Sequence, residues 1–120
     1  SYPFTSLFNI SHGHAVSLFF EKFFKFNYDN KDKSETTFDL KKRFDLIFDI
    51  FDASNINDFN SKISLIKKEA NLEDDMKKLN INIEKSSESI IKGINLLRLG
   101  NNPVKIDEID IRQIIKQNEI

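Results

Sequence analysis

The two histidines of this chain lie on either side of a glycine, in the segment SHGHAVSL at residues 11–18. An imidazole ring is both a good metal ligand and a good proton carrier. At the predicted start of a helix, His12 and His14 point about 200° apart, so at most one of them can bind a given ion. Gly13 permits a close backbone approach, and the free N–H groups of a helix start favour anions. The residues alone leave two alternatives open, a functional histidine and a capping or partly buried one.

Other chemistry has little support in the sequence. The chain has no cysteine, which excludes disulfides, thiolate zinc sites and cysteine nucleophiles. Two histidines are too few for a self-contained zinc site, which needs about four nitrogen or sulfur ligands. The run Glu73, Asp74, Asp75 is typical of a solvated helix start, and no arrangement favours a Ser-His-Asp triad.

Composition narrows the class of protein further. The 120 residues are 39% hydrophobic and 31% charged, enough for one domain with a single core. The net charge is −1, which argues against binding to a nucleic acid. No apolar run approaches the roughly 20 residues of a membrane-spanning helix, and we find no signal peptide. We therefore expect a cytoplasmic protein with neither a nucleic-acid nor a membrane partner.

Helices must position these residues, because three glycines and two prolines are very few turn formers for a β-rich chain. Apolar residues recur at helical spacing in several segments. The predicted helices cover residues 12–27, 37–53, 57–70, 72–79, 86–99 and a last one that begins at Asp107. We therefore predict an all-α fold, a multi-helix bundle of five or six helices.

Each predicted helix carries a more specific expectation. In the first, the residues predicted to face solvent are Ser17, Glu21, Lys22 and Lys25. The inward-facing residues predicted for later helices are Leu40, Phe44, Ile47, Phe48, Phe51, Phe59, Ile63, Ile66, Ala70, Ile90, Ile94, Leu97, Ile111, Ile114 and Ile115. Asn57 is a candidate cap, and Ser86 or Ser87 a candidate helix start. Gly100 fits a left-handed helix end, and Asp107 with Asp110 fits a capped start.

Two longer segments suggest a family. SYPFTSLFNISHGHAVSL at the front and LLRLGNNPVKIDEIDIRQII at the back resemble the C-terminal helical domain of the iron-containing alcohol dehydrogenases. These enzymes share a dehydroquinate synthase-like fold. The front segment matches the family's S-H-G motif, and the back segment matches its R-x-x-N-N-P turn and capped helix. Together the two segments bracket nearly the whole chain.

The resemblance implies a metal site built from more than this chain. One Asp and three His hold Fe²⁺, or sometimes Zn²⁺, in the family, and the last of these His corresponds to His12. The other ligands are expected upstream, the second His about one helical turn before Tyr2. Gly13 lets the helix start approach the cleft, while His14 either lines the substrate pocket or packs. Tyr2 stands where many relatives carry a His thought to relay protons, so we name Tyr2 and His14 as substrate-pocket candidates.

The resemblance also implies a longer parent protein. Ser1 in place of Met suggests that residues 1–120 are a partial C-terminal, metal-site domain. An N-terminal nucleotide-binding domain, absent here, would bind NAD or NADP and would be this domain's partner. The expected function is that of an NAD(P)-dependent, metal-dependent alcohol dehydrogenase or aldehyde reductase acting on a small alcohol or aldehyde. A homo-oligomer is a further option.

The alternative is a stand-alone helical protein-interaction domain without catalysis. In the enzyme hypothesis, the chain alone is inactive, because three of four metal ligands and the cofactor domain are missing. It also exposes an apolar patch and tends to self-associate. In the alternative, the chain is a clean monomer whose affinity for Fe²⁺ is that of a single histidine.

Overall fold

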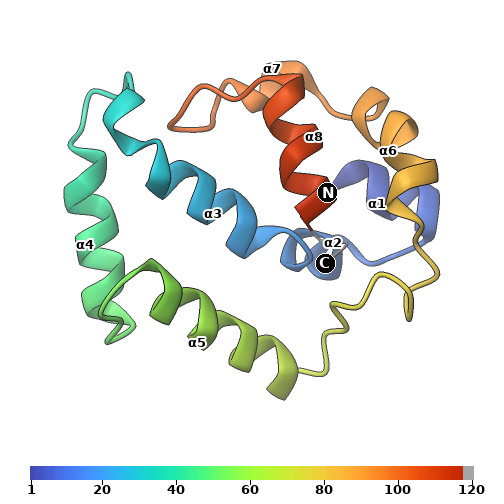
Figure 1. The fold of residues 1–120 in the computed structure, drawn as a ribbon, viewed down its shortest axis with the longest axis horizontal. Coiled ribbons are helices and arrows are strands. Elements are labelled where there is room, and N and C mark those ends of the chain that lie inside the picture. Colours follow the sequence, from blue (N-terminus) through green and yellow to red (C-terminus); the bar gives the residue numbers. More distant parts are fainter. Residues whose placement is uncertain (118–120) are drawn as a thin grey trace.

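The computed structural model describes residues 1–117, and within this range it contains helices, turns and loops but no strand (Figure 1). The elements are α1 (Tyr2–Phe8), α2 (His12–Ser17), α3 (Phe20–Asp29), the 3-10 turn η1 (Lys31–Lys33), α4 (Leu40–Ile50), α5 (Ile56–Glu69), α6 (Ile83–Lys92), α7 (Leu96–Leu99) and α8 (Glu108–Lys116). The predicted all-α fold is confirmed. The helices of the described residues are shorter and more numerous than the five or six predicted, because two predicted helices are broken and α1 precedes the first predicted range, while the predicted helix at 72–79 is absent.

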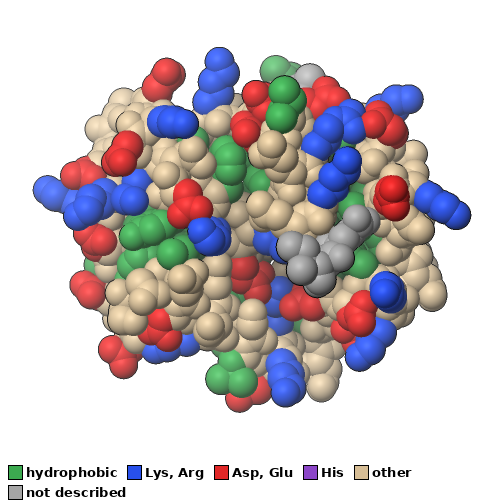
Figure 2. Space-filling model, viewed as in Figure 1, with side chains coloured by type: hydrophobic (Ala, Val, Ile, Leu, Met, Phe, Trp, Pro, Cys, Tyr) green, Lys and Arg blue, Asp and Glu red, His purple; other side chains and the backbone are tan. Residues whose placement is uncertain are grey.

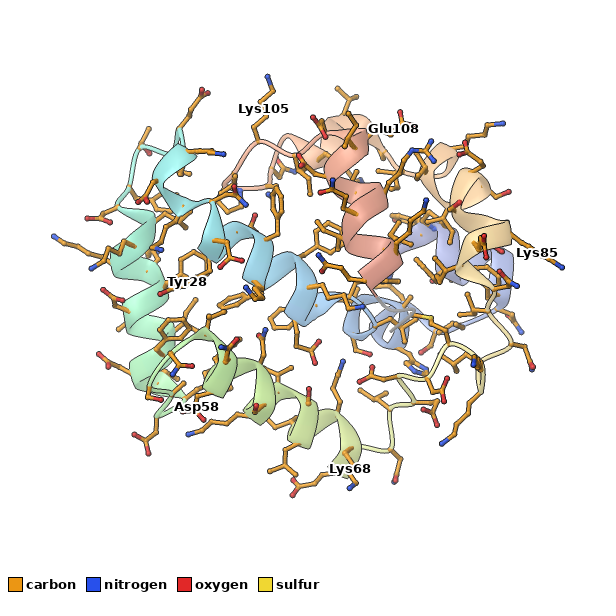
Figure 3. The ribbon with its side chains drawn as sticks, viewed as in Figure 1. Tyr28, Asp58, Lys68, Lys85, Lys105 and Glu108 are labelled. Carbon is orange, nitrogen blue, oxygen red and sulfur yellow. The ribbon has the colours of Figure 1, made fainter. Side chains whose placement is uncertain are left out.

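The helices surround two apolar clusters that meet along α3. Figure 1 shows α3 running between α4 and α5 on one side and α1, α2, α6 and α8 on the other. One cluster contains Phe4, Phe19, Ile90, Ile111 and Ile115, and the other contains Phe44, Phe48 and Phe59. Tyr28 reaches from α3 toward α4 (Figure 3), and its ring meets that of Phe44 edge-on at 5.3 Å. Helices α1 and α2, which carry the candidate residues Tyr2, His12 and His14, therefore lie at one end of a bundle whose two clusters are joined by α3.

The predicted helix at residues 12–27 is broken at Leu18 and Phe19. The Ser17 hydroxyl donates to the His14 carbonyl at 2.7 Å, a local bond of the kind that competes with regular helix geometry. Both Leu18 and Phe19 are buried, so the chain turns to bring these neighbours into one core. The prediction that Ser17, Glu21 and Lys22 face solvent was wrong, since all three are at least half-buried, whereas Lys25 is exposed.

The segment 72–79 forms a turn rather than the predicted short helix. Asn71 and Asn80 adopt left-handed backbone angles, with φ of 56° and 57°. Between them, the Glu73 carboxylate accepts from the backbone N–H groups of Asp74 and Asp75, and Asp75 accepts from that of Lys77. These bonds satisfy donors that a helix would otherwise use. The carboxylates are therefore turn formers and do not begin a helix.

Several predicted helix limits also moved. Asn55, not Asn57, caps α5 by accepting from the Asp58 N–H at 2.9 Å, and Asn82 caps α6 ahead of the predicted serines. Gly100 has a right-handed φ of −61°, so the left-handed prediction was wrong. The predicted inward residues that the structure leaves exposed are Phe51, Ile66, Ala70 and Leu97. The predicted inward residues Leu40, Phe44, Phe48, Phe59, Ile90, Ile111, Ile114 and Ile115 are buried.

Residues 86–99 divide into α6 and α7 where the chain passes α1. A Cβ atom on Gly93 would lie 2.9 Å from Pro3 Cγ, so the close approach of the two segments depends on this glycine. Asn95 then starts α7 by accepting from the N–H groups of Leu97 and Arg98. This cap fixes the backbone position of Arg98, whose side chain lies against Tyr2 of α1.

The start of α8 is as predicted. Asp107 accepts from the Asp110 N–H at 2.9 Å, and the Asp110 carboxylate accepts from the Asp107 N–H at 3.0 Å. We expect Asp107→Ala to lower the free energy of unfolding by about 1 kcal/mol, the usual contribution of such a cap. Urea unfolding followed by circular dichroism measures it. An unchanged midpoint would show that tertiary packing alone sets this helix start.

Candidate functional site

His12 is the first residue of α2, and its side chain is exposed. Nδ1 lies 3.3 Å from the Ser1 hydroxyl, and the ring centre lies 6.0 Å from that of Tyr2. No hydrogen bond to Nε2 is formed by the residues that the structure describes. His12 is therefore not a partly buried histidine, which was one of the alternatives that the sequence left open. One ring nitrogen is oriented by a hydroxyl while the other is open to a ligand.

His14 has a different environment. It is partly buried, and its Nε2 lies 2.7 Å from the carbonyl oxygen of Glu73. A carbonyl only accepts, so Nε2 carries a proton and is the donor in this bond. The bond ties α2 to the turn between α5 and α6. This bond gives His14 a structural contact, while the expectation that it lines a substrate pocket stays a prediction.

Tyr2 and Gly13 both border the exposed face of His12. The Tyr2 side chain is 57% exposed, and the Arg98 guanidinium carbon lies 5.0 Å from the centre of its ring. A Cβ added to Gly13 would meet nothing within 4 Å, so the described fold does not require glycine there. Its effect is to keep the backbone beside His12 free of a side chain. Arg98 belongs to the R-x-x-N-N-P segment, but sequence reasoning did not place it here.

A second cluster of charged residues lies between α3 and α5. Lys67 is only 6% exposed, and its Nζ donates to Asp74 Oδ1 at 2.8 Å, Glu21 Oε2 at 2.9 Å and the Ser17 carbonyl at 3.0 Å. Figure 2 shows a hollow near the centre of one face with acidic and basic side chains at its floor. Lys67 therefore joins α5 to the junction of α2 and α3 and to the turn after α5. No local pattern predicted this cluster, because its members come from distant positions.

Lys22 is the unpaired member of this region. Its Nζ is buried and has no hydrogen-bond partner among the described residues. Burial lowers the pKa of Lys22 to about 8, an effect that the positive charge of Lys67 reinforces and that Glu21 and Asp74 partly offset. The region thus contains one lysine, Lys67, whose amine is fully hydrogen-bonded, and one, Lys22, whose burial destabilises its charged form.

An apolar cavity of about 330 Å³ lies between α1, α2, α3, α6 and α8. Its lining includes Phe19, Phe23, Phe24, Ile90, Ile94 and Ile111. Val16 and Phe20, which also line it, remain 45% and 40% exposed. Ser1, the hydroxyl partner of His12, lies at the same cavity. Apolar surface is therefore left uncovered next to the candidate site.

The described residues do not form a metal site by themselves. Nowhere in residues 1–117 do three or more His, Cys, Asp or Glu side chains gather closely enough to hold an ion. The same residues include no helix long and apolar enough to cross a membrane. What the described chain presents is one open imidazole next to the Tyr2 ring, which also contacts the Arg98 guanidinium.

Comparison with known families agrees with this fold and with the two motifs. Residues 1–119 match the family described as the Fe-containing alcohol dehydrogenase family, C-terminal. The chain therefore belongs to this family and corresponds to its C-terminal domain. No curated protein and no solved structure matches it significantly. The family predicted from the sequence is thus confirmed.

Proposed function

We propose that this chain is the metal-binding, C-terminal part of an NAD(P)-dependent, metal-dependent alcohol dehydrogenase or aldehyde reductase. The observation that carries the proposal is the open Nε2 of His12 at the start of α2, in a chain of this family. The proposed cofactors are Fe²⁺ or Zn²⁺ together with NAD or NADP. The proposed substrates are small alcohols and aldehydes.

The donor chemistry at His12 fits such a metal. A neutral imidazole nitrogen suits Fe²⁺ and Zn²⁺, and a metal-binding histidine commonly donates its other N–H to an oxygen nearby. The Ser1 hydroxyl is in position to accept from Nδ1, which would orient Nε2 outward. When bound, the metal supplies a Lewis acid for the alcohol or carbonyl oxygen, and the nicotinamide supplies or takes the hydride.

One histidine cannot hold the ion alone, so the remaining ligands must come from elsewhere in the complete protein. We propose one Asp and two His upstream of Ser1. A His one helical turn before Tyr2 would share its face of an extended α1, since side chains four residues apart are neighbours. That face already lies beside His12, because the Tyr2 and His12 rings are 6.0 Å apart.

The residues of this chain then have distinct roles. His12 binds the metal, Gly13 leaves room beside it, and the Tyr2 ring forms one wall of the substrate site. His14 holds the turn after α5 against α2 through the Glu73 carbonyl. The open apolar cavity supports a partner domain in the same protein, because exposed apolar surface of this kind normally marks an interface.

The test uses the complete gene product that contains this chain, purified without oxygen. We expect close to one Fe²⁺ or Zn²⁺ per subunit and oxidation of NADH or NADPH that depends on an added aldehyde. A strong chelator should abolish turnover, and the metal should restore it. A complete product that neither binds metal nor oxidises either cofactor would contradict the proposal and favour a helical protein-interaction domain.

A further inference from the structure

The three arginines of this chain have different surroundings. Arg112 forms ion pairs with Glu88 and Glu108 at 2.5 and 2.6 Å. Arg43 and Arg98 instead lie over aromatic rings, those of Phe38 at 4.8 Å and Tyr2 at 5.0 Å. Within the described part of the chain, neither has a carboxylate within salt-bridge distance. Arg43 and Arg98 therefore both lie over an aromatic ring without a carboxylate partner, but the two rings have different neighbours.

The surroundings of Arg98 are those of the proposed metal site. Its guanidinium carbon is 5.0 Å from the centre of the Tyr2 ring, and that ring centre is 6.0 Å from the centre of the His12 ring. The guanidinium can therefore be no more than 11 Å from the imidazole. Three separate elements, α7, α1 and α2, contribute one residue each to this group.

The backbone that carries Arg98 is held at both ends of its short helix. Asn95 accepts from the Arg98 N–H at 3.3 Å and from the Leu97 N–H at 3.0 Å. Beyond α7, the side-chain amides of Asn102 and Asn27 bond to each other at 2.7 and 3.0 Å, which fixes the following turn to α3. The fold thus sets the backbone position from which the Arg98 side chain reaches the Tyr2 ring.

A guanidinium stacked on a ring keeps its N–H donors at its edge, in the plane of the group. These donors match the two oxygens of a carboxylate or a phosphoryl group. We propose that Arg98 binds the anionic group of the substrate while the alcohol or aldehyde end lies at His12. This inference rests on the proposed function and adds the substrate class, a short alcohol or aldehyde that carries an oxyanion.

The same donors could meet the phosphate of a dinucleotide cofactor, so the experiment must separate the two sources. We suggest Arg98→Gln and Arg98→Lys in the complete protein, with Arg43→Gln as a matched control that removes an equivalent stacked arginine. The probes are 4-oxobutanoate and butanal, two four-carbon aldehydes that differ by a terminal carboxylate. KM for NADH and NADPH is measured alongside, and circular dichroism checks folding.

The unsubstituted enzyme should prefer 4-oxobutanoate over butanal in kcat/KM. Arg98→Gln should lower this preference about 10- to 100-fold, as expected for the loss of hydrogen bonds to a charged group. Arg98→Lys should restore part of it, and Arg43→Gln should leave it unchanged. Inorganic phosphate should compete with 4-oxobutanoate in the unsubstituted enzyme and less well in Arg98→Gln.

Three results would overturn the inference in different ways. If Arg98→Gln left the preference for 4-oxobutanoate over butanal unchanged in an active enzyme, Arg98 would not bind the substrate. A raised KM for NADPH or NADH, equal with both aldehydes, would assign the guanidinium to the cofactor. A complete protein without metal and without NAD(P)H oxidation would remove the proposed function itself, and this inference with it.

Discussion

Replacing His12 with asparagine is expected to lower kcat/KM of the complete enzyme by roughly 10²- to 10⁴-fold, with loss of most of the bound metal. A Lewis acid at the reacting oxygen stabilises the transition state by several kcal/mol, and each 1.36 kcal/mol is a factor of ten in rate. Among the described residues, the contacts found for the exposed His12 ring are those with Ser1 and Tyr2, so the fold should survive. Metal analysis and steady-state kinetics on the same preparation measure both effects.

His14→Asn is the matched control, because it removes the neighbouring imidazole in the same helix. This change leaves the Glu73 carbonyl without its donor at 2.7 Å, so we expect a loss of about 1 kcal/mol in stability and an unchanged metal content. The account predicts opposite patterns for the two histidines. Loss of metal in His14→Asn with full retention of metal in His12→Asn would contradict the account, because it would make His14 the metal ligand.

Lys67→Met is expected to lower the free energy of unfolding by about 3 kcal/mol. Removing one partner of a buried ion pair leaves the other charge without compensation. Here the stranded group is Glu21, whose side chain is only 13% exposed, while Asp74 is 47% exposed and can turn to solvent. The bond to the Ser17 carbonyl is lost as well. Urea unfolding at neutral pH measures the change.

Lys22→Met provides the comparison at the same site and should have the opposite sign. It removes a buried amine that has no hydrogen-bond partner among the described residues, only a 5.8 Å contact with the centre of the Phe19 ring. The pKa of Lys22 is about 8 in the folded chain and near 10.5 when unfolded, so the unfolded chain binds more protons between these values. Stability therefore rises as pH rises from 8 to 10.5, and Lys22→Met should remove this rise. Destabilisation by Lys22→Met would contradict this account and would mean that contacts of the amine, such as that with the Phe19 ring, outweigh the cost of its burial.

Local sequence patterns predicted those parts of the fold that depend on neighbours along the chain. Asp107 and Asp110 are three residues apart and cap α8 through each other's backbone, so no distant residue is needed. The stripe of Ile111, Ile114 and Ile115 is buried as expected. Few glycines and strong helical spacing were likewise enough for the all-α class.

Some of the failures arise because contacts between distant residues decide which side chains are buried. Glu21 and Lys22 have the spacing of a solvent-facing pair, but α5 packs beside them and Lys67 forms an ion pair with Glu21. Leu97 has the spacing of a core residue but is 89% exposed, because the chain breaks at Gly93 to pass Pro3. The spacing of apolar residues along the sequence cannot predict contacts between distant segments such as these.

The candidate site divides in the same way. The SHG motif and the family resemblance were sufficient to select His12, Gly13 and Tyr2 from the sequence. Arg98 escaped notice because it lies 96 positions after Tyr2 in the chain, and only the fold stacks it on that ring. The role of His14 in packing also required the structure, since its partner is the backbone of Glu73.

Anomalous X-ray diffraction at the iron edge, from crystals of the complete protein grown with Fe²⁺ and without oxygen, tests the central claim most directly. The account predicts one strong peak about 2 Å from Nε2 of His12, the usual length of a metal–imidazole bond. A metal bound elsewhere in the protein, or a His12 ring with no metal beside it in an enzyme that turns over, would contradict it.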